Sequence, residues 1–127
     1  MEGCWSGVVN QLFRIDPRIR YVGIVDMQYR VMASEMRPGM ASLTTSETDR
    51  TFVSMVPRVM VEGAQKLASD CGPMEIMTVR YRKVVLAIYN TGQHIVMLSY
   101  DPSVETPFTA VLVRELRRVF QYDGAHG

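Results

Sequence analysis

The chain has 127 residues, a net charge of +1, 47% hydrophobic residues and 21% charged residues. This length is typical of one domain, and the composition is too apolar for a disordered protein. The near-neutral charge excludes a general attraction to nucleic acid or to an acidic membrane, so neither is expected as a partner.

Cys4 and Cys71 lie far apart in the sequence, so we expect reduced thiols and no disulfide framework. The first seven residues carry neither a basic leader nor a long apolar core. No apolar run reaches the roughly 18 residues that a membrane helix needs. We therefore expect a cytoplasmic protein in which residues 1–127 form a single domain.

Apolar residues recur at helical spacing in the first segment, and two β-branched stretches follow with a short connection typical of a hairpin. Capping-box spacings at Thr44–Glu47 and Ser46–Asp49 begin a second helix. Three strands and a last helix capped by Thr106 complete the chain. The predicted elements are a helix over Cys4–Ile15, strands over Ile19–Val25 and Val31–Met36, a helix over Ser46–Asp70, strands over Glu75–Tyr81, Val84–Tyr89 and Ile95–Tyr100, and a helix from Thr106.

The helix predicted over Ser46–Asp70 is long for its sheet. At 1.5 Å per residue it would extend about 37 Å, whereas a seven-residue strand spans about 23 Å. It must overhang the sheet or bend, and Pro57 is the place where a missing hydrogen bond allows a bend. Gly63 is expected to mark a close contact between this helix and the sheet, with approach of a ligand as the alternative.

The polarity of the strands predicts their order in the sheet. A strand covered on both faces is apolar throughout, whereas an edge strand mixes polar and apolar residues. By this test the first, fourth and fifth strands are central and the second and third are edges. We predict an α/β (α+β) fold, α-β-β-α-β-β-β-α, with a five-stranded antiparallel sheet in the order 2-1-5-4-3. The long helix covers one face and the two shorter helices cover the other.

The segment from Tyr21 to Ser34 carries the most specific resemblance to a known family. With this element order it resembles the roadblock/dynein light chain 7 superfamily, and more loosely the profilin-like and longin folds. It departs from that pattern at Gln28-Tyr29, where glycine is common. The chain is also similar to small uncharacterised archaeal proteins. The roadblock resemblance implies a non-catalytic dimer that scaffolds complexes or regulates a small GTPase.

Catalytic and metal-binding patterns are missing from the sequence. Cys4, Cys71, His94 and His126 do not stand at ligand spacings, and Cys71 is predicted at a helix carboxyl end, where the dipole disfavours a thiolate. No nucleophile elbow or phosphate-binding glycine loop occurs. We expect no enzymatic activity, no cofactor and no metal.

The sequence favours a protein-interaction or scaffolding module, with a small-molecule sensor that has a pocket between sheet and helix as the alternative. The basic run Arg80–Lys83 is interpreted as a charged turn beside an edge strand rather than a nucleic-acid site. We expect a homodimer joined by the Glu75–Tyr81 strand and the long helix, because both expose apolar residues. The candidate interface residues are Ile76, Met77, Val79, Tyr81, Val59, Met60 and Leu67.

Overall fold

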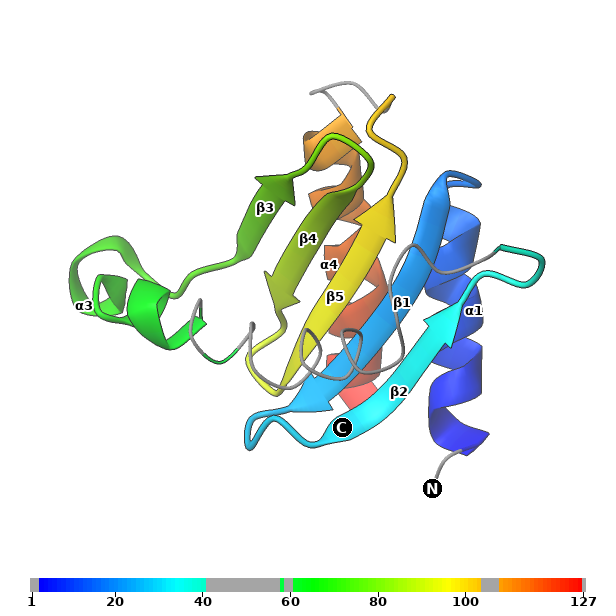
Figure 1. Cartoon of the computed structure of the whole chain (residues 1–127). Helices are drawn as coiled ribbons and strands as arrows, with labels where there is room; N and C mark the ends of the chain where they lie inside the picture. The colour runs from blue at the N-terminus through cyan, green and yellow to red at the C-terminus, as the bar shows by residue number, and fades with distance from the viewer. Residues whose placement is uncertain (1–2, 41–57, 59–60, 104–107, 127) are drawn as a thin grey trace.

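A computed structural model describes residues 3–40, 58, 61–103 and 108–126 of the chain (Figure 1). Residues 61–65 are helical. Each of the five strands begins and ends within one residue of its predicted bounds. The elements are α1 Gly3–Ile15, β1 Ile19–Asp26, β2 Val31–Met36, α3 Ala68–Cys71, β3 Ile76–Arg80, β4 Val85–Asn90, β5 His94–Tyr100 and α4 Phe108–His126.

The five strands form one antiparallel sheet in the order β2-β1-β5-β4-β3, which confirms the predicted order. Leu98 at the centre of β5 pairs with Val22 of β1 on one side and with Ala87 of β4 on the other. Because the pairing is antiparallel throughout, β2, β3 and β5 end at the same end of the sheet at which β1 and β4 begin (Figure 1).

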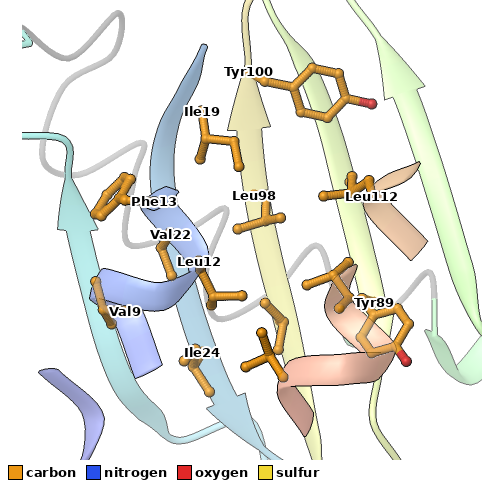
Figure 2. Close-up of a cluster of buried hydrophobic side chains, with 14 of the residues drawn as sticks. Val9, Leu12, Phe13, Ile19, Val22, Ile24, Tyr89, Leu98, Tyr100 and Leu112 are labelled. Atoms are coloured by element: carbon orange, nitrogen blue, oxygen red, sulfur yellow. The ribbon is translucent and has the colours of Figure 1, made fainter. Parts of the chain in front are cut away.

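One face of the sheet is covered by α1 and α4, which lie side by side behind it in Figure 1. Leu12 of α1, Leu98 of β5 and Leu112 of α4 are buried between these layers, and Figure 2 shows them pointing toward one another. Burying one leucine side chain stabilises a fold by about 2 kcal/mol. This cluster is the main apolar core, and it fixes the two helices on the sheet.

The opposite face carries a second cluster, built from the alternate residues of the same strands. Its members are buried, and the helical segment 61–65 contributes Val61 to it. The prediction of helices on both faces is therefore confirmed. The buried residues of this cluster are Val25, Val61, Ile88, Ile95 and Met97.

In the turn between β1 and β2, Tyr29 stands in the part where the roadblock pattern commonly has glycine. Tyr29 has φ +63°, a left-handed conformation that costs a non-glycine residue about 1–2 kcal/mol. Asp26 offsets part of this cost, since its carboxylate accepts hydrogen bonds from the backbone N–H groups of Gln28 and Arg30, both at 2.9 Å. The Tyr29 ring also packs against the second cluster, and the Arg58 guanidinium lies 5.0 Å from its centroid.

The sequence predicts one continuous helix over Ser46–Asp70, but the structure shows a break before Asp70. Residues 66–67 form a turn in which Leu67 N–H donates to the Ala64 carbonyl (3.2 Å), and α3 follows. This tighter bonding ends the helical segment before α3 begins. Gly63 is exposed, and a Cβ there would meet nothing within 4 Å, so the predicted close contact with the sheet is wrong. Pro57 and the helix start lie outside the described residues.

Candidate interaction surface

β3 presents a free backbone edge. It is hydrogen-bonded to β4 on one side, and no other described strand lies on its other side. The backbone N–H of Tyr81 donates to the Val84 carbonyl at 2.8 Å, so Tyr81 faces β4. Because residues alternate along an antiparallel ladder, the backbone groups of Ile76, Thr78 and Arg80 face outward. A further strand would bind to these three residues.

The side chains of β3 and its flank divide between the two sides of the sheet. Ile76 packs against the core under α1 and α4, whereas Met77 packs against the second cluster. Val79 is half-buried, and the Tyr81 side chain just beyond the strand is 56% exposed. The structure thus brings four of the predicted interface residues to one edge, with Val79 and Tyr81 the two that do not belong to a described core cluster.

The helical part of the predicted interface is described only at its end. Leu67 is 63% exposed in the turn before α3, and α3 lies beyond the β3 edge near the start of that strand (Figure 1). Val59 and Met60 lie outside the described residues. Leu67 is therefore the one described member of the helical set, and it faces solvent on the β3 side of the molecule.

The two ends of β3 differ in charge. At its start, the Glu75 carboxylate forms a bidentate ion pair with Arg117 of α4, with an N–O distance of 2.6 Å. At its end, an Arg80 N–H donates to the Pro102 carbonyl at 2.5 Å, and no described carboxylate forms an ion pair with Arg80. An antiparallel pair of β3 strands would place the acidic start of one strand against the basic end of the other.

Of the four residues considered for metal binding or nucleophilic chemistry, only Cys71 and His94 have side chains that the structure describes. Cys71 is a free, exposed thiol, and no group of three or more His, Cys, Asp and Glu side chains in the described ranges is arranged to hold a metal ion. The His94 ring stacks edge-on against Trp5 at 4.7 Å, and burial lowers its pKa while the charge of Asp26 opposes that shift. His94 is thus part of the packing between α1 and the sheet.

A hollow of about 580 Å³ lies between α1 and α4. Ile15, Val119, Arg14 and Glu115 are among the residues that line it. It is not the predicted pocket between sheet and helix, which stays a prediction.

No family model matches the sequence and no curated protein matches it, but the described arrangement has clear counterparts among solved structures. An MglB solved in a tetrameric arrangement superposes with a TM-score of 0.69 over 93% of this chain and 85% of that chain, at 15% identity. The roadblock/LC7 domain from Streptomyces avermitilis gives 0.66 over 92% of each chain, at 10% identity. The chain has the roadblock/LC7 fold. Profilin IA from Acanthamoeba castellanii, at 13% identity, gives a TM-score of 0.51 over 93% of this chain and 94% of that chain.

The roadblock fold and its looser likeness to profilin confirm the fold expected from the resemblance of the Tyr21–Ser34 segment, and membership of the superfamily stays a prediction. In this roadblock-fold chain none of the described helices is both long and apolar enough to span a bilayer. The similarity to archaeal proteins stays a prediction.

Proposed function

We propose that this roadblock-fold chain is a non-catalytic protein-interaction module that works as a homodimer, joined edge to edge through β3. The carrying observation is the β3 edge itself, where outward backbone groups lie next to the half-buried Val79 and the exposed Tyr81. An edge strand of this kind is completed by water or by another strand. A two-fold axis at β3 would join two sheets into one and cover both side chains.

The charges at the ends of β3 support this pairing. Like charges from Arg80, Arg82 and Lys83 would oppose a parallel arrangement of two β3 strands. In the antiparallel arrangement these cations approach the end of the neighbouring strand where the Glu75–Arg117 ion pair lies, so the two basic ends are kept apart. The exposed Leu67 adds apolar surface on the same side of the molecule. A stable interface of this type buries at least about 1,000 Å² in total.

The partner class follows from the fold. MglB, one of the proteins that shares it, has been solved in a tetrameric arrangement, which supports assembly as a property of the fold. The roadblock resemblance makes a small GTPase the first partner class to test. An exposed thiol at Cys71 fits a reducing compartment, so we place the dimer in the cytoplasm.

Light scattering tests the dimer and its site together. The wild-type chain should have about twice the 14.4 kDa protomer mass at micromolar concentration. Val79→Asp should weaken association about a hundredfold or more, because it would bury an unpaired carboxylate at the centre of the interface.

The matched control is Val31→Asp, which introduces the same charge on the other edge strand, where the valine is 51% exposed. That variant should keep the wild-type mass. A wild-type mass of 14.4 kDa, or equal loss of the dimer in both variants, would refute the β3 interface.

A further inference from the structure

The antiparallel topology gathers cationic side chains at one end of the sheet, where β2, β3 and β5 end and where β1 and β4 begin (Figure 1). Contacts tie these segments together. Asp101 N–H donates to the Arg18 carbonyl at 3.1 Å, Arg37 N–H to the Arg20 carbonyl at 2.7 Å, and Arg80 reaches Pro102. The cations of this basic end are Arg18, Arg20, Arg37, Arg80, Arg82 and Lys83.

The carboxylates described at this end do not balance the cations. They are Asp16, which pairs with Arg18 at 2.8 Å, Asp101, and Glu35 further along β2. Ser103 N–H donates to Asp101 and lowers its pKa, and the charges of Arg20 and Arg18 lower it further. The excess is about three positive charges. Glu47, Asp49 and Glu105 lie outside the described residues and are not counted.

The remaining cations keep their charge even where they are hydrogen-bonded. Arg37 donates to three carbonyl oxygens and Arg80 to one, and carbonyl groups carry no compensating charge. Arg82 and Lys83 are exposed and make no hydrogen bond or ion pair with another described residue.

The shape of the basic end fits an extended chain. Five strands about 4.8 Å apart give a row about 19 Å wide, which an extended peptide of about six residues would span at 3.3 Å per residue. Alternate side chains of such a peptide face the same way, so six acidic residues would present about three carboxylates to the row. That number equals the excess charge, and Arg82 is an exposed arginine of the kind that binds a carboxylate as a fork.

We propose that the basic end of the sheet, with Arg80, Arg82 and Lys83 at its most exposed part, binds an extended acidic segment of a partner protein. Nucleic acid fits less well, because its binding depends on neutralising backbone phosphates, and the excess here is about three charges within a chain of net charge +1. The surface lies at the end of the strands rather than along the β3 edge, but it shares Arg80, Arg82 and Lys83 with the proposed dimer. Peptide binding is therefore compared between samples of the same oligomeric state.

Fluorescence anisotropy with a labelled hexaglutamate peptide tests the proposal, with hexaglutamine as the uncharged control. The full chain should bind hexaglutamate and not hexaglutamine, and the affinity should fall as NaCl rises from about 50 to about 500 mM. The double variant Arg82→Glu/Lys83→Glu should weaken binding at least about tenfold.

The control variant Lys66→Glu/Arg114→Glu makes the same change in net charge at exposed residues away from the basic end. It should keep at least half of the wild-type affinity. Equal loss in both variants would show a general charge effect and overturn the proposal. Tighter binding to a single-stranded DNA 12-mer or to anionic lipid vesicles than to hexaglutamate would also overturn it. Light scattering on each sample gives its oligomeric state and so separates peptide binding from dimer formation. If the affinity for hexaglutamate changes with the oligomeric state and not with the charge at residues 82 and 83, the proposed surface is wrong.

Discussion

Arg37 ties three separate segments together at the end of β2. Its guanidinium donates hydrogen bonds to the carbonyls of Phe13 (2.6 Å), Asp16 (2.8 Å) and Ile19 (2.6 Å). Phe13 lies in the last turn of α1, where carbonyl groups have no partner within the helix. The same guanidinium lies 5.0 Å from the centroid of the Phe13 ring. One side chain thus caps α1 and holds the connection to β1.

Replacing this arginine with methionine should keep the aliphatic packing and remove the three bonds. Each lost hydrogen bond lowers stability by about 1 kcal/mol net, because water can take the place of the arginine donor. Arg37→Met should therefore lower the free energy of unfolding by about 3 kcal/mol. With a urea m-value of about 1.5 kcal/mol per molar, the unfolding midpoint should fall by about 2 M. Arg37→Lys keeps the charge but cannot reach three acceptors at once, so it should lose about half as much.

The control is Arg82→Met, which removes an exposed arginine that makes no hydrogen bond with another described residue. It should change stability by less than about 0.5 kcal/mol. All variants are compared at one protein concentration, because a dimer gains stability by mass action. If Arg37→Met and Arg82→Met shift the midpoint equally, the capping role of Arg37 is wrong.

Two further predictions concern His94 and the glycines. The pKa of His94 is lowered by burial below its ordinary 6.5, so the folded state binds fewer protons than the unfolded state. Stability should therefore fall as the pH drops below about 6.5, and urea titrations of His94→Gln should show a weaker fall; parallel pH profiles would refute this role. Gly7 in α1 has open space around it, so Gly7→Ala should stabilise the fold by about 0.5–1 kcal/mol. Gly92 has φ +95°, so Gly92→Ala should destabilise it by about 1 kcal/mol, and thermal melting shifts of the same sign would contradict this contrast.

The sheet order could be predicted because burial leaves a clear mark on strand composition. β5 is apolar from Ile95 to Leu98 and lies in the centre, whereas β2 mixes polar and apolar residues and forms an edge. Turn formers gave the strand ends to within one residue. These signals are local, and each strand carries its own.

The break before α3 could not be predicted, because Lys66, Leu67 and Ala68 are all good helix formers. The helix ends in the turn hydrogen bond from Leu67 N–H to the Ala64 carbonyl, which residue propensities do not report. Gly63 was misinterpreted for a related reason: glycine in a helix indicates close packing only where the surroundings are crowded, and no sequence pattern reports crowding.

The candidate interface was partly predictable, since the apolar residues of β3 are visible in the sequence. The basic end of the sheet was not. Its cations come from residues 18–37 and 80–83, and only the antiparallel topology brings them together. The sequence showed one basic run, which alone indicates no more than a solvated turn.

Amide exchange at the two sheet edges gives a direct view of the β3 pairing. The amides of Ile76, Thr78 and Arg80 face away from β4, so nothing in one protomer's described sheet protects them. On β2, Arg37 N–H donates to the Arg20 carbonyl of β1, and successive residues alternate in direction. The amides of Ser34 and Met36 therefore face away from β1. In the dimer the β3 edge should be covered, whereas the β2 edge should stay exposed to solvent.

The central claim is the β3 dimer, and residue-resolved hydrogen exchange measured by NMR tests it most directly. In the wild-type protein the Thr78 amide should exchange as slowly as that of Val79, whereas Ser34 should exchange quickly. In Val79→Asp the protection of Thr78 should disappear while the core amide of Leu98 stays protected. If Thr78 exchanges as fast as Ser34 in the wild-type protein, β3 is an open edge and the proposed dimer does not form through it.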